Sequence, residues 1–445
     1  MMRAIIRSVP KCTDRLSDGT VTVLLAALLA GPITDARAQW PQWGGPNRNF
    51  TVETKGLAKS WPEDGPRRIW HRELGDGYSA IVVDDGMLYT MYRKKYTDEE
   101  EFTVALDAKT GKTVWQHKIP APLPEHVEDY GYGPYSTPLM VGDCLWTIST
   151  KAVVRCYDKK SGEVLWRNDL VSEFGAAPLR GPGYASSPLA YKDTIILLGW
   201  RKPGRDYIGI TDADLQLPAP PTIAALDQRT GRVSWKNLDF DPGPASPVLI
   251  NFAGKDQLVV CVEQGFIGVD PENGELLWHH KVEQDSVNVT PIFNGKDLIF
   301  WSNGGQRATG GRALRLFEKN GKTAVEEVWS SPKIRFAMPT PVLVGDYVYG
   351  SSARILMGVN IKTGKRTWAK RGFDDVACVY ADGKFIFLDE NGHLGLATVT
   401  PEELTVHSTH KVTERYSFTV PTLVDTTLYV RDRRHIMALD LGRSQ

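Results

Sequence analysis

The phrase "DAKTGKTVW" (107–115) recurs along the chain, and this repetition constrains the fold more than any other feature of the sequence. Near copies are "DKKSGEVLW" (158–166), "DQRTGRVSW" (227–235) and "DPENGELLW" (270–278). Each copy combines an Asp that can bond to nearby backbone with a Gly that tolerates positive φ, which is how a tight turn between strands is encoded. Alternating apolar residues flank the turn. The phrase therefore predicts a hairpin, and its repetition predicts an array of similar units.

Each unit divides into four short strands, for example "STPLMVGD", "CLWTIST", "AVVRCYDKKSG" and "EVLWRNDL". Four strands in a unit of about forty residues are typical of a propeller blade. Eight such units begin near Tyr78, Tyr135, Tyr184, Pro244, Asn288, Phe336, Asp374 and Tyr416. The sequence therefore predicts an all-β protein, an eight-bladed β-propeller of four-stranded antiparallel blades.

The eighth unit stops where its outermost strand should begin, and the missing strand is found near the other end of the chain. The stretch "RRIWHREL" (67–74) has the pattern of an outermost strand, with Trp70 in the expected place. We expect this strand to complete the last blade and close the ring, which leaves no free edge at the seam. The tryptophans of the outer strands should pack as wedges between blades; they are Trp70, Trp115, Trp166, Trp235, Trp278, Trp329 and Trp368. The seventh unit lacks this Trp.

The amino terminus has the pattern of a secretory signal peptide. Basic residues precede the apolar run "VTVLLAALLAG", and "ARA" (36–38) supplies small residues for cleavage after Ala38. A short anchoring or buried helix is the alternative reading of this run. The predicted organisation is a signal peptide (1–38), an N-terminal segment (39–66) and the propeller (67–445). No Cys follows the cleavage point, so we expect a periplasmic or secreted protein without a lipid anchor.

The composition argues against a nucleic-acid partner, and it does not decide whether Cys144 and Cys156 form a disulfide. The chain has 53 basic and 53 acidic residues and no basic run interleaved with aromatics, so we expect no nucleic-acid partner. No apolar run is long enough to span a membrane after signal cleavage, and we expect a monomer. Cys144 and Cys156 flank a predicted hairpin, where either a disulfide or two buried thiols would fit.

The repeats resemble those of the quinoprotein-type (PQQ-like) β-propellers. The resemblance rests on "TPLMVGDCLW" (137–146), "AALDQRTGRVSW" (224–235) and "VALDAKTGKTVW" (104–115), and it covers nearly all of residues 67–442. That family includes quinone-dependent alcohol dehydrogenases and also non-catalytic propellers such as the outer-membrane assembly lipoprotein. The resemblance therefore implies the fold but does not decide between catalysis and binding.

Four long connections are predicted to decorate one face of the ring. Residues 92–102, 201–221 and 302–312 join second to third strands, and residues 120–134 join two blades. In an up-and-down blade these connections share a face, while the short Asp-to-Gly turns share the opposite one. Because long loops on a rigid scaffold commonly carry binding, we expect a binding or scaffold role at this face, for a protein partner or a saccharide-like ligand.

Polar and aromatic residues that enter the innermost strands on this face should surround the central funnel. Such residues can bind carboxylates or sugar hydroxyls and offer flat contact area. The candidate binding residues are Tyr135, Arg180, Tyr184, Asn288, Arg335, Arg415 and Tyr416, and the candidate catalytic carboxylates are Asp285 and Asp375.

The alternative function is a PQQ-dependent alcohol or sugar dehydrogenase with calcium in the funnel. The resemblance implies a calcium-ligating Glu, Asn and Asp set, an Arg near the quinone and a catalytic carboxylate. Asn288, Asp285, Arg335 and Asp375 match these residue types but complete no family motif. The adjacent-cysteine pair common in the dehydrogenases is absent from the sequence. PQQ and calcium are expected only under this alternative, no metal site is predicted otherwise, and the sequence leaves open whether the protein is an enzyme.

Overall fold

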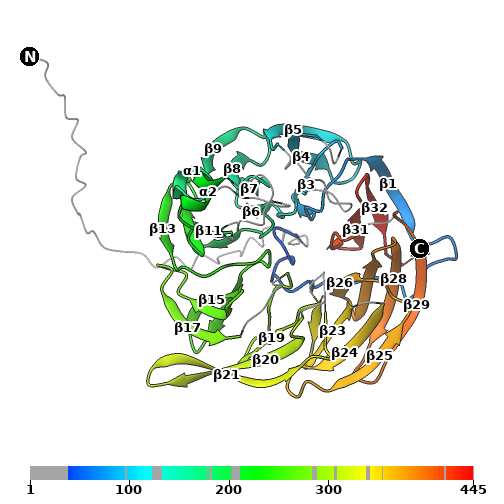
Figure 1. The fold of residues 1–445 in the computed structure, drawn as a ribbon. Helices are drawn as coiled ribbons and strands as arrows, with labels where there is room; N and C mark the ends of the chain where they lie inside the picture. The colour runs from blue at the N-terminus through cyan, green and yellow to red at the C-terminus, as the bar shows by residue number, and fades with distance from the viewer. Residues whose placement is uncertain are drawn as a thin grey trace, which may run out of the picture. The chain divides into compact units, whose positions relative to one another are not determined.

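The computed structural model describes residues 39–443 except 96–97, 123–132, 178, 180–182, 201, 203–210, 283–287, 305–307, 337–340, 353 and 415–416. Arg37–Gln445 form one compact unit, and the predicted signal peptide lies outside the described residues. Eight four-stranded antiparallel sheets follow one another around a ring, which confirms the predicted propeller (Figure 1). Among the described residues, no helix is long and apolar enough to cross a membrane.

The first four blades are consecutive four-strand units. Blade 1 contains β2 (Val82–Asp84), β3 (Met87–Tyr92), β4 (Glu100–Asp107) and β5 (Thr113–Pro120). Blade 2 contains β6 (Leu139–Val141), β7 (Cys144–Ile148), β8 (Val153–Asp158) and β9 (Val164–Asp169). Blade 3 contains β10 (Leu189–Tyr191), β11 (Thr194–Leu198), β12 (Ile223–Asp227) and β13 (Val233–Asn237). Blade 4 contains β14 (Val248–Phe252), β15 (Lys255–Val262), β16 (Gly265–Val269) and β17 (Leu276–Lys281).

The last four blades complete the ring. Blade 5 contains β18 (Ile292–Phe293), β19 (Leu298–Trp301), β20 (Gly311–Lys319) and β21 (Lys322–Ser331). Blade 6 contains β22 (Val342–Val344), β23 (Tyr347–Ser352), β24 (Ile355–Asn360) and β25 (Arg366–Arg371). Blade 7 contains β26 (Val376–Ala381), β27 (Lys384–Asp389), β28 (His393–Val399) and β29 (Leu404–Lys411). Blade 8 contains β30 (Thr422–Val424), β31 (Thr427–Arg431), β32 (His435–Asp440) and β1 (Arg67–Glu73).

The ring closes as predicted, because β1 from the amino-terminal side is the outermost strand of blade 8. It pairs antiparallel with β32, from Arg67 opposite Asp440 to Glu73 opposite His435. Two short helices lie in connections: α1 (Leu170–Phe174) between blades 2 and 3, and α2 (Asp212–Gln216) between the second and third strands of blade 3. Cys144 and Cys156 are free thiols; each faces a different residue of the partner strand, Asp158 and Trp146 respectively.

The tryptophan of the outer strand joins most blades to the turn of the next blade. The indole N–H of Trp115 in blade 1 donates to Lys159 O in the blade 2 turn at 3.0 Å. The same bond recurs from Trp70 to Ala108 O, Trp166 to Gln228 O, Trp329 to Ile361 O and Trp368 to Thr400 O. Five of the seven predicted wedges therefore bond to the neighbouring blade, whereas the Trp278 indole donates to Gln257 Oε1 of its own blade at 2.8 Å and the buried Trp235 N–H has no hydrogen-bond partner among the described residues.

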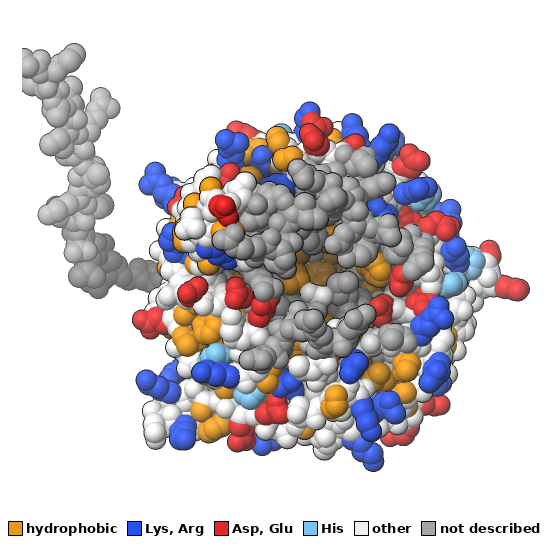
Figure 2. Space-filling view, viewed as in Figure 1, with side chains coloured by type: hydrophobic (Ala, Val, Ile, Leu, Met, Phe, Trp, Pro, Cys, Tyr) orange, Lys and Arg blue, Asp and Glu red, His pale blue; other side chains and the backbone are white. Residues whose placement is uncertain are grey.

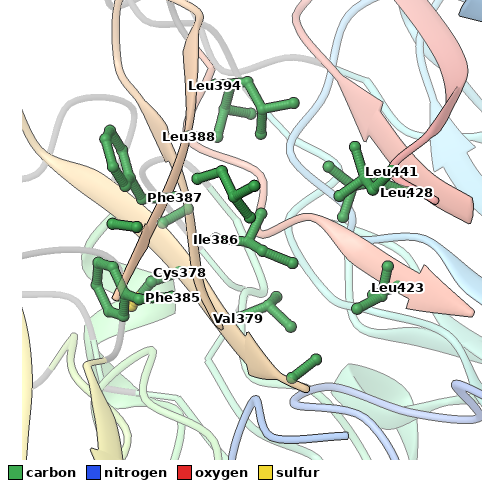
Figure 3. Close-up of a cluster of buried hydrophobic side chains, with 14 of the residues drawn as sticks. Cys378, Val379, Phe385, Ile386, Phe387, Leu388, Leu394, Leu423, Leu428 and Leu441 are labelled. Atoms are coloured by element: carbon green, nitrogen blue, oxygen red, sulfur yellow. The ribbon is translucent and has the colours of Figure 1, made fainter. Parts of the chain in front are cut away.

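Apolar side chains from neighbouring blades interdigitate and fill the space between the blades, as is usual in close-packed protein interiors. Figure 3 shows this between blades 7 and 8, with Val379, Ile386 and Leu388 facing Leu423, Leu428 and Leu441. All six side chains are buried. Each blade thus buries its faces against its neighbours.

The N-terminal segment enters the central channel, where it is coloured dark blue in Figure 1. Its base lies near the ends of the innermost strands: Trp40 exchanges two backbone bonds of 3.0 Å with Val83, and Val52 N donates to Tyr380 O at 3.1 Å. Its tip lies near their beginnings, since Arg48 donates to Pro188 O and to Pro247 O at 3.0 and 3.2 Å. We call residues 40–52 the channel insert.

The N-terminal segment also provides a tryptophan to blade 7, whose outer strand has none. Ser408 stands at the Trp position, one residue after the bulge that every outer strand has. Trp61 N donates to Ser408 Oγ at 2.8 Å, and the Trp61 side chain is 9% exposed within the core shared by blades 7 and 8. Trp61 therefore supplies the wedge that the repeat of blade 7 does not contain.

Candidate functional site

The long connections share one face, as the sequence predicts. The antiparallel order of each blade places second-to-third and blade-to-blade connections together, opposite the short hairpin turns. We call these two sides the loop-rich face and the turn face. One prediction is corrected in part: Glu100–Phe102 belong to β4 and not to a loop, because they pair with Lys118–Pro120 of β5.

The channel insert spans the channel from the turn-face side. It contacts the innermost strand, or the residue just before it, in blade after blade: Trp40 meets Val83, Pro41 O accepts from Met140 N, and Trp43 Nε1 donates to Thr290 Oγ1 at 3.3 Å. Arg48 holds blades 3 and 4, and its burial lowers its pKa to about 9, so the guanidinium stays charged at neutral pH. We call the part of the channel on the loop-rich side of the insert the funnel.

Three aromatic side chains meet at the funnel mouth. Tyr78, Tyr135 and Phe418 each lie six residues before the last residue of an innermost strand, which ends at Asp84, Val141 or Val424. The rings of Tyr78 and Tyr135 are stacked, with centroids 5.6 Å apart and planes 10° apart, and Phe418 lies 5.9 Å from Tyr78. All three are partly exposed. We call them the aromatic arc; it crosses blades 8, 1 and 2.

Polar residues occupy the same position in two other blades. Asp375 lies six residues before the end of β26, and Asn288 lies three residues before Pro291, as Tyr135 does before Pro138. Asn288 is exposed and Asp375 is partly buried. We call these two residues the polar arc. Blade 5, which carries Asn288, stands opposite blade 1 in the ring of eight (Figure 1).

A buried ion pair holds the loop-rich face together between blades 1 and 2. Arg93 Nη2 donates to Glu101 Oε1 at 2.7 Å, and both side chains are almost fully buried. Arg93 also donates to Asp98 O, Ala121 O and Thr150 Oγ1, and the Thr150 hydroxyl donates to Glu101. Burial raises the pKa of Glu101 and lowers that of Arg93, and their mutual attraction opposes both shifts. Burying such a pair costs desolvation energy, and its hydrogen bonds fix the positions of the strands that carry it.

A second buried arginine holds blades 8 and 1 below the aromatic arc. Arg431 is inaccessible to solvent and donates to Ser79 O at 3.2 Å and Met91 O at 2.8 Å. Next to it, Arg433 makes a bidentate pair with Asp76, with Nε to Oδ1 at 2.9 Å and Nη2 to Oδ2 at 2.5 Å. Arg431 and Arg433 therefore link blade 8 to blade 1 beside Tyr78. Hydrogen bonds from a charged donor are stronger than those between neutral groups.

The structure sorts the candidate residues. Tyr135, Asn288 and Asp375 lie at the funnel mouth. Tyr184 is buried, its hydroxyl donates to Leu198 O at 2.8 Å, and burial raises its pKa, so its contacts are those of a core residue. Arg335 is exposed and its Nε donates to Pro332 O at 2.9 Å. The remaining candidates lie outside the described residues; they are Arg180, Asp285, Arg415 and Tyr416.

Sequence reasoning missed Tyr78 and Phe418 as site residues. Aligning the units on the last residue of their first strands would have placed both residues at the position of Tyr135. That alignment needs the strand ends, which the structure supplies.

Of the residues that match the dehydrogenase pattern, Asn288, Arg335 and Asp375 are described and Asp285 is not. Asn288 and Asp375 belong to blades 5 and 7, with blade 6 between them. Over the described ranges, no group of three or more His, Cys, Asp and Glu side chains is placed to hold a metal ion.

A separate groove of about 1110 Å³ lies between the N-terminal segment and the seam of blades 7 and 8. Its charged lining includes Arg68, Arg443 and His410, together with Arg67, which pairs with Asp440 at 2.7 Å. None of the candidate site residues lines this groove.

Surface chemistry differs between the centre and the edge of the ring. Figure 2 shows hydrophobic side chains at the centre and charged side chains around the edge. Smaller hydrophobic patches also occur toward the edge, where outer strands expose residues such as Val114, Leu165 and Leu276.

Comparison with known proteins finds similar sequences and folds. The chain is 22% identical over 205 residues to the outer membrane protein assembly factor BamB of Pseudomonas aeruginosa; the match covers 46% of this chain and less than half, 45%, of that relative. The fold resembles that of BamB from Moraxella catarrhalis, with a TM-score of 0.55, 13% identity and coverage of 84% of this chain and all of that one. It also resembles the quinohemoprotein alcohol dehydrogenase of Comamonas testosteroni, with a TM-score of 0.50, 12% identity and coverage of 92% and 81%.

A family profile covers most of the propeller. It matches residues 99–370, from β3–β4 of blade 1 to the outer strand of blade 6, and so includes more than half of the chain. The chain therefore belongs to the family of PQQ-like repeat propellers described as outer membrane protein assembly factor BamB.

Proposed function

We propose that this chain is a non-catalytic binding module that holds a protein partner through its loop-rich face, in the periplasm or outside the cell. The observation that carries the proposal is the gathering of all long connections on one face of a closed ring. Loops on a rigid scaffold are the usual carriers of binding, and a ring sealed by β1 is such a scaffold. The relative from Pseudomonas aeruginosa is named an assembly factor, which favours a protein partner.

The buried charges on the loop-rich face support the same proposal. Arg93, Glu101 and Arg431 are almost fully buried beneath this face, although isolated buried charges are costly. Each has several backbone or side-chain partners, and each makes at least one bond to the neighbouring blade. They keep the roots of the loops fixed, which lowers the ordering cost of binding a partner.

The test is capture of envelope proteins by immobilised residues 39–445, followed by crosslinking. The loop-rich face is altered by Lys94→Glu and by replacing the exposed helix α2 (Asp212–Gln216) with a Gly-Ser linker. Matched controls with the same charge change, Lys109→Glu and Lys160→Glu, alter exposed turns of the turn face. We expect the loop-face changes to abolish a specific capture without lowering the melting temperature and the controls to retain it. Equal capture by all variants would contradict the proposal.

A melting scan separates this function from the dehydrogenase alternative. A ligand that binds only the folded state raises its stability, so pyrroloquinoline quinone with calcium should leave the melting temperature unchanged if the chain is a binding module. A saturable rise would instead favour a quinoprotein and would justify a dye-linked screen of alcohols and sugars.

A further inference from the structure

The groove between the N-terminal segment and the seam of blades 7 and 8 lies at the outer side of the ring, apart from the funnel. Its volume is about 1110 Å³, and residues 56–68 form one wall. The rest of the lining combines the end of β29, around His410 and Val412, with turn-face residues of blade 8, such as Thr426 and Gly442. β1, β29 and the carboxyl end of the chain meet there (Figure 1). A cavity of about 300–1,000 Å³ holds a whole small-molecule ligand, so a simple ion would leave this groove mostly empty.

The wall formed by the N-terminal segment is held in place by hydrogen bonds that do not use the charged side chains of the groove. Ala58 N donates to Leu441 O at 2.8 Å, and Trp61 N donates to Ser408 Oγ at 2.8 Å. These bonds fasten the segment to blade 8 and to blade 7, respectively. A preformed groove lowers the ordering cost of binding a ligand.

The side chains that line the groove leave an excess of positive charge. Arg67 pairs with Asp440 at 2.7 Å. Arg68 and Arg443 are exposed, and their guanidinium groups form no hydrogen bond or ion pair with the residues that the structure describes. Asp64 is the other acidic residue of the described lining. Two unpaired guanidinium groups against one further carboxylate favour a ligand with several negative charges.

The backbone next to these arginines favours a peptide over a small anion. β1 starts at Arg67 and is the outermost strand of its sheet, so one edge of β1 has no partner strand among the described elements. Such an edge presents unpaired N–H and C=O groups, to which an extended chain can add. Trp61 and Val412 add apolar side chains to the lining of the same groove. The ligand that fits these features is extended, acidic and partly apolar.

We propose that this groove binds an extended acidic segment of a protein partner. Carboxylates of the segment pair with Arg68 and Arg443, because the planar guanidinium group forms two parallel hydrogen bonds with a carboxylate. Apolar side chains of the segment contact Trp61 and Val412, and its backbone lies along the start of β1. None of the loop-face changes described above alters a residue of the groove. The inference therefore adds a second binding surface to the proposed function and does not depend on it.

The test begins with a phage-displayed library of random octapeptides, selected on immobilised residues 39–445. The library is first depleted on the double variant Arg68→Glu with Arg443→Glu, so that the selection reports on the groove. We expect the selected peptides to contain more Asp and Glu than the starting library. An unchanged composition, or no enrichment while the melting temperature shows that the protein is folded, would overturn the inference.

Titration of a selected peptide, followed by fluorescence anisotropy, then tests the individual residues. Arg68→Ala and Arg443→Ala should each weaken binding about tenfold or more, as expected when a hydrogen bond between charged groups is lost. Ser60→Trp introduces an indole at an exposed position of the lining and should abolish binding. Arg229→Ala is the matched control, because Arg229 is an exposed arginine in a turn-face turn of blade 3. Equal weakening by Arg229→Ala and by Arg68→Ala would contradict the groove as the site.

Competition and the loop-face changes separate the alternatives. If citrate or inorganic phosphate displaces the peptide at the peptide's own concentration, the groove is a small-anion site and the peptide inference is wrong. Lys94→Glu and the replacement of α2 should leave peptide binding unchanged. If they abolish it, the peptide lies on the loop-rich face and the groove is not its site. A failure of the selection leaves the capture experiment unaffected, so the groove and the proposed function can fail separately.

Discussion

Gly162 of blade 2 lies directly against the indole ring of Trp115 in blade 1. A Cβ atom on Gly162 would be 2.5 Å from Trp115 Cδ2, and Gly162 has a φ of +75°. The glycine is thus required twice, once for the positive φ of the turn and once for the close approach of the neighbouring blade. The same relationship joins Gly111 to Trp70, Gly231 to Trp166, Gly274 to Trp235 and Gly364 to Trp329.

We predict that Gly162→Ala destabilises the protein more than Gly142→Ala. Gly142 also has a positive φ, +59°, but a Cβ atom added to it would have no neighbour within 4 Å. Gly142→Ala should therefore cost about 1 kcal/mol for the backbone alone, whereas Gly162→Ala adds about 1–3 kcal/mol of overpacking against Trp115. Urea unfolding of both variants measures the difference. Equal losses would show that the indole moves away without cost.

Trp61 should contribute to stability as much as the outer-strand tryptophans do, although it lies outside the repeats. We expect Trp61→Ala to lower the free energy of unfolding by about 3 kcal/mol, as for other buried tryptophans. Ser408→Trp should also destabilise, because Trp61 already occupies the space. The double variant should lose less than the sum of the two, since the new indole can enter the vacated site. If the losses of stability of the two single variants simply add in the double variant, Trp61 does not occupy the site of the missing outer-strand tryptophan.

The buried pair Arg93–Glu101 should be costly to break on one side. Glu101→Leu leaves Arg93 buried without its counter-ion and is expected to destabilise by about 3–5 kcal/mol. The double variant Arg93→Met with Glu101→Leu removes both charges and should be more stable than Glu101→Leu alone. Chemical denaturation of these two variants, of the single variant Arg93→Met and of the unchanged protein gives the coupling energy. A double variant as unstable as the single one would show that the remaining bonds of Arg93, to Ala121 O and Thr150, matter more than the pair.

The seam of the ring should weaken in acid. His71 of β1 stacks on His435 of β32 with centroids 4.9 Å apart. Partial burial, and then the charges of His435 and Arg68, lower the pKa of His71 below its ordinary value, against a smaller opposing effect of Asp432. The unfolded chain therefore binds the proton more tightly, so stability is full above about pH 6.5 and falls as pH drops below it.

The effect of this histidine is measurable as a difference between variants. Because His71 is largely exposed, solvent screening keeps the loss to about 0.5 kcal/mol or less. His71→Gln, or His435→Gln, should show a smaller fall in melting temperature between pH 7.5 and pH 5 than the unchanged protein. An equal fall in all three proteins would exclude this pair as the cause.

Much of the fold could be predicted because the repeat encodes contacts that are local or nearly so. The Asp-to-Gly turns, the alternation of the strands and the Trp of each outer strand lie within nine-residue phrases such as residues 107–115. The incomplete eighth unit and the orphan strand with Trp70 together specified the closure, because an outer strand needs a partner edge. The candidate site was less predictable: Tyr135, Asn288 and Asp375 lie at the funnel mouth, whereas Tyr184 points into the core.

The sequence by itself therefore determined the blade, the number of blades and the way the ring closes. Only the tertiary structure decided the rest. It placed residues 40–52 in the channel and Trp61 in blade 7, because these contacts join residues far apart in the chain, 140 positions for Arg48 and Pro188 and 347 for Trp61 and Ser408, and follow no repeat. It also brought Tyr78, Tyr135 and Phe418 into one cluster, because side chains from three blades meet only when the ring has closed.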